Sequence, residues 1–224
     1  MSEVGKPNVG TDMLRIHSVI TRGLDVSIER SAGFAQEGYP DAATQEGFVI
    51  YVQALVSVLS AHHLAEDEVA FPYLRDKLPD APFDELMADH RVMEGILEEL
   101  QASAEAVTAE AQAGDSLNDL NRAVTRLADL WHPHIQKEER SIYDVETIAA
   151  LMDVDENVRL GRMLAEHSQQ HLQPPYLGMP FVLYNLPAEE RAILAQKMPP
   201  IVTQQLVPVD WKEKWAPMQP FLLD

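Results

Sequence analysis

The chain has 224 residues, which suits one domain with an extension or one large domain, and its 46% apolar and 24% charged residues are ordinary for a soluble globular protein. Its net charge of −19 would repel nucleic acid and anionic membranes, which argues against nucleic-acid and membrane roles. The absence of cysteine excludes disulfides, iron–sulfur clusters, thiolate zinc sites and Cys nucleophiles, so a metal must be held by His, Asp, Glu or Tyr.

The chain carries no sequence signal for export or membrane insertion. The first ten residues lack the basic segment and the apolar segment of a signal peptide. The most apolar stretch, residues 48–61, is shorter than the roughly 20 residues that span a bilayer, and Gln53 and Ser57 interrupt it. We therefore expect a buried helix of a cytoplasmic protein.

Helical periodicity continues through most of the sequence, and signals for strands are nearly absent. The first predicted helix covers residues 11–36, with Thr11 or Asp12 as its N-cap, and the second covers residues 42–78, with a bend at Pro72. The third covers residues 82–113. The fourth covers residues 117–152 after the break at Gly114, with a kink expected at Pro133.

Four long helices joined by short loops predict an all-α fold, an up-down antiparallel four-helix bundle formed by residues 1–152. A fifth helix is expected over residues 155–173, and prolines become frequent from Pro174 onward. The tail also carries Phe181, Tyr184, Trp211 and Trp215, too many aromatic residues for a disordered linker. We expect residues 153–224 to form a helical, Pro-rich extension packed on the bundle, as a lid or as an interface that could include a homodimer.

A repeated motif gives the strongest functional signal. The pattern His-x-x-x-Glu, followed by an acidic residue, occurs twice, 72 residues apart, and a further His precedes each copy by 45 or 44 residues. The six residues are His17, His62, Glu66, His90, His134 and Glu138. The chain therefore appears as two similar helical hairpins, which predicts pseudo-two-fold symmetry.

The spacing within the motif has a direct structural consequence. Residues four apart lie on one face of a helix, so His62 with Glu66, and His134 with Glu138, can direct an imidazole and a carboxylate to one point. Packed together, the hairpins would aim four His and two Glu inward, a balanced set for two metal ions. Without thiolates, imidazole and carboxylate ligands favour iron or manganese over zinc.

These residues resemble the motif of the hemerythrin-like family, whose ligands follow the order H…HxxxE…H…HxxxE, and the resemblance covers about three-fifths of the chain. It implies two iron ions, with an oxo or hydroxo bridge as an option and manganese as the less favoured metal. It also implies that the four His are terminal ligands and that Glu66 and Glu138 are bridges. A ferritin-like diiron site is excluded, because no His has a Glu three residues before it.

The sequence departs from the oxygen-carrying members at two points. The last carboxylate, Glu138, follows His134 at a tighter spacing than in those members and is Glu rather than Asp. Those members place a second His four residues after the third-helix His, where this chain has Glu94. A carboxylate ligand favours Fe(III), which argues against reversible O2 carriage and favours redox turnover. Glu94 could equally be a solvated residue of the helix surface.

Three other histidines have open roles. His63 lies about 100° around the helix from His62, which favours an outer or surface position over the edge of the second iron. His167 and His171 form a His-x-x-x-His pair that could close the site or bind a second metal, although such a pair is more often a solvated face. Glu94, His63 and His167 are thus the additional candidate ligands.

The sequence favours a diiron oxidoreductase that binds and reacts with O2, H2O2 or NO, with peroxide or oxidase chemistry. An oxidase or oxygenase acting on a small organic substrate is an alternative, as is a non-catalytic iron- or oxygen-binding or sensing protein. A helical bundle without metal is the structural alternative. The individual catalytic residues remain unassigned.

Overall fold

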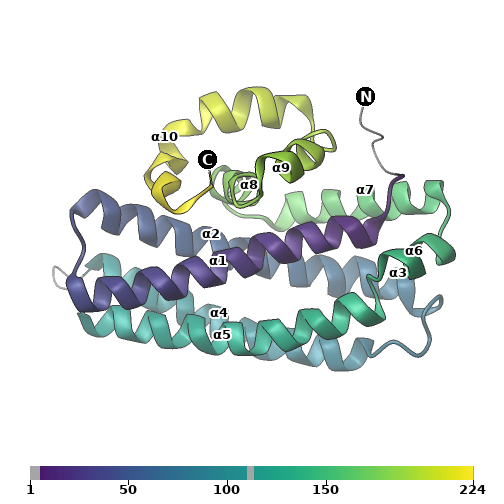
Figure 1. Cartoon of the computed structure of the whole chain (residues 1–224), viewed down its shortest axis with the longest axis horizontal. Helices are drawn as coiled ribbons and strands as arrows, with labels where there is room; N and C mark the ends of the chain where they lie inside the picture. The colour runs from purple at the N-terminus through teal and green to yellow at the C-terminus, as the bar shows by residue number, and fades with distance from the viewer. Residues whose placement is uncertain (1–5, 110–113, 224) are drawn as a thin grey trace.

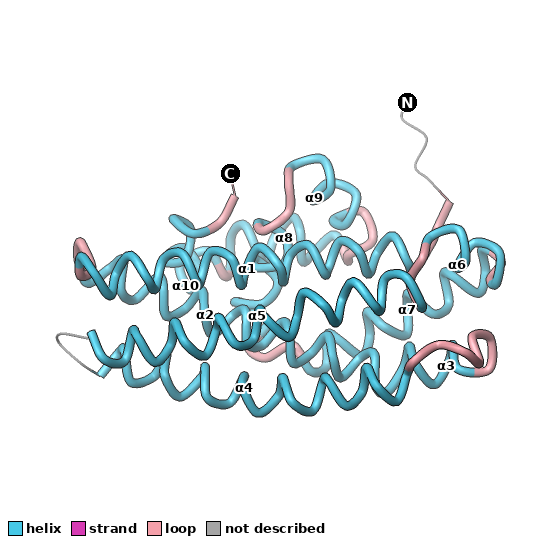
Figure 2. Tube along the Cα trace, turned by 60° about the horizontal axis from the view of Figure 1, so that its bottom comes forward, coloured by secondary structure: helices cyan, strands magenta, loops and turns pink. Residues whose placement is uncertain are grey.

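The computed structural model describes residues 6–109 and 114–223, and every regular element in these ranges is a helix (Figure 1). Four long helices lie side by side as a bundle: α1 (Val9–Glu37), α2 (Ala42–Ala65), α4 (Phe83–Ala109) and α5 (Gly114–Ser141) (Figures 1 and 2). Helix α5 packs against α1 and α4, and α2 packs against α4 and α1. Each long helix can therefore direct side chains into a shared interior.

The long helices begin close to the predicted positions, and the differences have local causes. Helix α1 starts two residues early because Asn8, rather than Thr11 or Asp12, is its N-cap: the Asn8 side chain accepts a hydrogen bond from the Thr11 backbone amide. The end of the third predicted helix, at residues 110–113, lies outside the described residues. Helix α5 starts at Gly114 and continues through Pro133.

The second predicted helix changes its hydrogen-bonding pattern before Pro72. Helix α2 is followed without a break by a π-helical segment, η1 (Glu66–Ala70), and by α3 (Phe71–Arg75). The backbone amide of Phe71 bonds to the carbonyl of Glu66, five residues back. Pro72 has no amide to donate, and a wider turn before it accommodates the missing bond. The π segment begins at Glu66, one of the predicted ligands.

The fourth predicted helix was wrong as one continuous element. The chain leaves the helix after Ser141, and a short helix, α6 (Val145–Leu151), follows. Asp144 caps α6 by accepting a hydrogen bond from the amide of Thr147. The apolar residues Ile142 and Tyr143 lie at this break and are fully buried, so their packing competes with helix continuation.

After α6 the chain folds back along the bundle. Helix α7 (Val154–His171) opens with a capping box of Asp153 and Glu156 and packs against α2, η1 and α1. The remaining elements gather beside α1 and α2 (Figure 1). They are α8 (Pro175–Tyr184), α9 (Ala188–Ala195), a π-helical segment η2 (Val202–Asp210), α10 (Lys212–Trp215) and a 3-10 helix η3 (Ala216–Phe221).

A buried polar network joins this C-terminal part to the bundle. The hydroxyl of Tyr51 on α2 donates to Asn185 after α8 at 2.9 Å. Arg22 on α1 donates to the Asn185 side chain and to the carbonyl of Phe221 at 3.0 Å. Close backbone packing accompanies these bonds, since a Cβ on Gly47 would lie 2.0 Å from the carbonyl oxygen of Pro217.

Two apolar clusters form the core. The larger contains Leu55, Trp131 and Phe181, and the smaller contains Phe71, Leu86 and Tyr143. The helical stretch Ala42–Arg75 is long and apolar enough to cross a membrane by length and composition alone, longer than residues 48–61 suggested, but 67% of its most apolar window is buried within the protein. Packing against the other helices accounts for its apolar character.

Candidate metal centre

Two groups of buried ligand-type side chains lie in the bundle interior. One comprises His17 from α1, His62 from α2, Glu66 from η1 and Glu138 from α5; the other comprises His63 from α2, His90 from α4 and His134 from α5. Within each group the donor atoms lie within 4.8 Å of one another. All seven side chains are buried, with Glu66 and Glu138 at 0% exposure. The structure thus brings together the six predicted residues and adds His63.

The two groups adjoin each other through the carboxylates. Glu66 lies 3.2 Å from His62 Nε2 and 3.6 Å from His90 Nε2. Glu138 lies 3.4 Å from His17 Nε2 and 3.7 Å from His134 Nε2. Glu66 also lies 3.9 Å from His17 Nε2. Each glutamate therefore faces histidines of both groups, as a carboxylate shared between two ions would.

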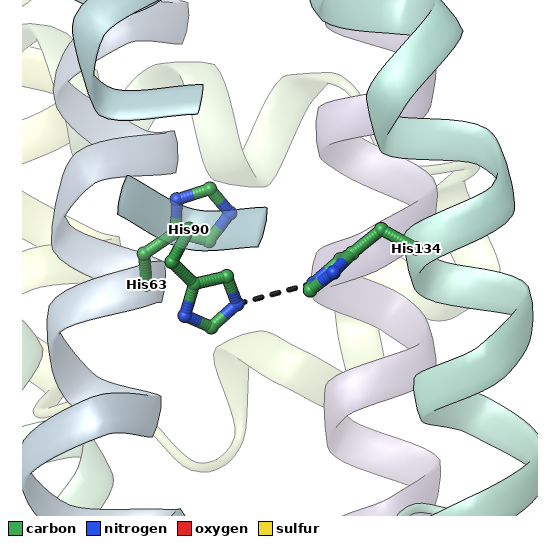
Figure 3. Close-up of side chains that lie close together, drawn as sticks. All are labelled: His63, His90 and His134. Atoms are coloured by element: carbon green, nitrogen blue, oxygen red, sulfur yellow. Dashed lines mark hydrogen bonds between the residues drawn. The ribbon is translucent and has the colours of Figure 1, made fainter. Parts of the chain in front are cut away.

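The second group converges from three helices (Figure 3). The Nε2 atoms of His90 and His134 are 3.1 Å apart, and the rings of His63 and His90 stack at 4.1 Å between centroids. Two ligands about 2.1 Å from one ion at a right angle would be about 3.0 Å apart. The His90–His134 distance therefore suits two donors to one cation.

Carboxylates outside the cluster orient three of the histidines. His17 Nδ1 lies 2.9 Å from Glu139, His90 Nδ1 lies 2.8 Å from Asp67, and His134 Nδ1 lies 3.4 Å from Asp89. Such partners fix the ring and leave Nε2 free to face a metal. Asp67 and Glu139 are the acidic residues that follow Glu66 and Glu138 in the repeat, so the symmetry extends beyond the ligands.

The cluster leaves many buried polar atoms without hydrogen bonds. Those of the ligand set are His17 Nε2, His62 Nε2, both ring nitrogens of His63, and both carboxylate oxygens of Glu66 and of Glu138. Each buried polar group without a partner costs about 1–3 kcal/mol. Cations bound by these atoms would remove that cost, so the residues present fit a metal centre.

The electrostatics of the ligand set lead to the same conclusion. Burial lowers the pKa of His134 to about 3 and that of His62 and His63 well below the ordinary value, with the neighbouring histidines adding to the effect. Burial raises the pKa of Glu138 to about 8, and burial together with Glu138 raises that of Glu66. The protein alone thus favours neutral side chains, whereas cations would favour ionised carboxylates.

Aromatic side chains enclose the cluster. Trp131 lies 5.7–6.2 Å, between ring centroids, from His17, His62, His63 and His134, and donates its indole N–H to Thr21. Tyr143 lies 6.0 Å from His17, and its buried hydroxyl has no hydrogen-bond partner. Burial, with Glu66 and Glu138 nearby, raises the pKa of Tyr143 well above its usual range.

The additional candidates have different outcomes. His63 is buried in the centre rather than placed at the surface, because α2 lies between α1 and α4 and its buried stripe is wide enough to include both His62 and His63. Glu94 is exposed and lies 3.3 Å from Ser60 Oγ, away from the cluster. The argument against O2 carriage that assumed Glu94 as a ligand therefore loses its basis. His167 lies at the surface beside Glu68, apart from both groups.

The fold and the site define an all-helical protein with a buried His and Glu metal-binding cluster. A family model described as the hemerythrin HHE cation binding domain matches residues 12–146, more than half of the chain and a range that includes all seven side chains. The chain therefore belongs to the hemerythrin HHE cation-binding family. Searches of curated proteins and of solved structures found no significant match.

Proposed function

We propose that the chain is a non-haem diiron protein that binds and reacts with O2, H2O2 or NO. The observation that carries the proposal is the shared position of Glu66 and Glu138, each of which faces histidines of both groups. Two separate mononuclear sites would not require a common pair of buried carboxylates. Iron is favoured over manganese because five of the seven donors are imidazoles, which suit iron better than they suit manganese.

Each ion would have its own histidines. His17 and His62 would hold one ion, His63, His90 and His134 would hold the other, and the two glutamates would lie between them. A pair of irons, when bound, supplies two one-electron couples for the reduction of a diatomic molecule or of peroxide. The chain contributes fixed ligands, because Glu139, Asp67 and Asp89 restrain three of the imidazole rings.

The enclosure of the centre favours small ligands over an organic substrate. All seven side chains are buried, and Trp131, Tyr143 and Phe71 pack around them. The surface hollow of about 320 Å³ between α2 and α4 is lined by Glu94 and its neighbours and includes none of the seven. A diatomic molecule or peroxide needs far less space than an organic substrate.

Reversible binding of O2, or sensing, is the second candidate, and His63 is the observation that favours it. His63 supplies a fifth imidazole, whereas Glu94, the additional carboxylate candidate, lies outside both groups. A neutral imidazole supports Fe(II) better than a carboxylate does. The ligand set therefore does not distinguish turnover from reversible binding. The two functions differ in how the iron-loaded protein reacts with O2, peroxide or NO.

The expected arrangement of the chain around the centre follows from the same proposal. Residues 1–152 would act as an up-down four-helix unit that holds the irons in a cytoplasmic protein. Residues 153–224 would cover α1 and α2 as a lid or as a dimer interface. The buried Tyr51–Asn185 hydrogen bond supports a fixed cover.

The test is iron loading under anaerobic conditions, followed by metal analysis and optical spectra after addition of O2, peroxide, azide or NO. We expect about two irons per chain and near-ultraviolet bands that change with each ligand. The variant His62→Ala/His134→Ala removes one donor from each group and should lose most of the iron. His132→Ala is the matched control, because His132 is partly exposed and belongs to neither group.

Three outcomes are informative. Two irons with repeated consumption of peroxide or NO would support turnover, and two irons with spectral changes that reverse on degassing would support carriage or sensing. Equal iron in the double variant and in the unaltered protein would refute the diiron centre altogether.

A further inference from the structure

A second cluster of metal-ligand side chains lies at the surface, where α7 crosses the π-helical segment η1. Its members are Glu68 on η1 and His167 and His171 on α7, each with a donor atom within 4.8 Å of the other two. His167 and His171 lie outside the part of the chain that matches the family model. The cluster shares no residue with the two buried groups, so it is separate from the centre described above.

The geometry of the cluster suits chelation. The rings of His167 and His171, one helical turn apart, stack at 4.3 Å between centroids, and His167 Nε2 lies 2.8 Å from Glu68 Oε2. Two histidines at positions i and i+4 of a helix are an established arrangement for binding one metal ion. The third donor comes from a different element, so a bound ion would connect η1 to α7.

The partial burial of His167 distinguishes the cluster from a fully solvated pair of histidines. The side chain of His167 is only 13% exposed, and its Nδ1 is buried without a hydrogen-bond partner. Glu68 and His171 are exposed, so an ion can reach the cluster from solvent. A partly buried imidazole with two solvent-accessible donors nearby is a favourable arrangement for a surface metal site.

We propose that Glu68, His167 and His171 bind one divalent transition-metal ion, with zinc as the representative. Two imidazoles and one carboxylate suit zinc, copper, nickel or Fe(II) rather than magnesium or calcium, which prefer oxygen ligands. Zinc and copper bind such a set more tightly than Fe(II) does, so zinc is the better probe of a surface site. The net charge of −19 raises the local concentration of cations at the surface. The ion would connect α7, the helix that follows α6, to the segment that begins with Glu66.

The test uses the iron-loaded full chain, dialysed against micromolar zinc, with zinc and iron both measured by mass spectrometry. We expect one zinc per chain with the iron content unchanged. His171→Ala and Glu68→Gln should each weaken zinc binding at least about tenfold, since even partners outside the first shell contribute that much. His132→Ala serves again as the control and should keep the zinc.

A second measurement separates a site from a general effect of zinc on an acidic protein. Zinc should raise the melting temperature of the unaltered protein and of His132→Ala but not that of His171→Ala. Equal zinc binding in all variants would overturn the proposal, as would iron loss matched to zinc gain in all of them, because zinc would then occupy the buried centre. If iron loading fails, zinc can also enter the buried centre, but the difference in zinc content between the unaltered protein and His171→Ala still reports on this cluster, because His171 belongs to neither buried group. The two proposals can therefore fail separately.

Discussion

Asp67 offers a sharp test of how the buried centre is held, because it touches a predicted ligand without being one. Its carboxylate lies 2.8 Å from His90 Nδ1, and its side chain is 25% exposed. Asp67→Ala removes the group that orients His90 toward the cluster, whereas Asp67→Asn keeps a hydrogen-bonding oxygen and removes only the charge. Loss of such a partner weakens metal binding by about 10–100-fold.

The expected magnitude follows from linkage. A loss of about 10–100-fold in affinity corresponds to about 1.4–2.7 kcal/mol of stability under saturating metal. For a chain of this size, that lowers the melting temperature of the iron-loaded protein by roughly 3–11 °C. The metal-free protein should also lose some stability, about 1–3 kcal/mol, because the buried His90 Nδ1 loses its hydrogen-bond partner. The metal-linked part is the additional loss seen only in the iron-loaded protein. Asp67→Asn should lie between Asp67→Ala and the unaltered protein.

The assay is calorimetry of loaded and metal-free samples together with competitive iron titration. Glu139→Ala is the symmetric variant, because Glu139 orients His17 in the same way. Glu99→Gln is the control, since Glu99 pairs with Arg126 at the surface. Equal destabilisation of the loaded and metal-free forms by Asp67→Ala would show a purely structural role and refute the reasoning.

Two further predictions concern the metal-free protein. The pKa of Glu138 is about 8 in the folded protein, compared with an ordinary value of 4.5 in the unfolded chain. Between pH 4.5 and 8 the folded state therefore keeps a proton that the unfolded state loses. The contribution of Glu138 to stability falls as the pH rises through this range. The pKa of His134 is about 3 in the folded protein, compared with an ordinary value of 6.5 in the unfolded chain. Between pH 3 and 6.5 only the unfolded state binds the proton, so the contribution of His134 to stability rises with pH over this range. Because the pKa values of several buried histidines are lowered, the melting temperature of the metal-free protein should be highest near pH 6.5. A melting temperature that keeps rising up to pH 8 would contradict this prediction. Separately, Gly47→Ala should cost about 1–3 kcal/mol by denaturant unfolding, because the added methyl meets the Pro217 carbonyl; an unchanged value would show that η3 is loosely held on α2.

Local rules explain why so much of the centre was predictable. The i, i+4 spacing of His62 with Glu66, and of His134 with Glu138, depends only on helix geometry. The repeat then implied that both pairs meet. The all-helical class followed from periodicity in the same way.

Three features required tertiary contacts. The burial of His63 depends on how much of the surface of α2 is covered by the neighbouring helices. The spacing of residues within α2 does not reveal this. The break after Ser141 depends on burial of Ile142 and Tyr143. The pairing of Glu68 with His167 joins residues 99 positions apart.

The sequence by itself determined the helical class and the residue types that meet in the interior, because both depend on interactions within one or two helical turns. The tertiary structure decided which neighbours complete that set and which acids orient it. It did so because burial, helix rotation and long-range pairing are set only when the helices pack together.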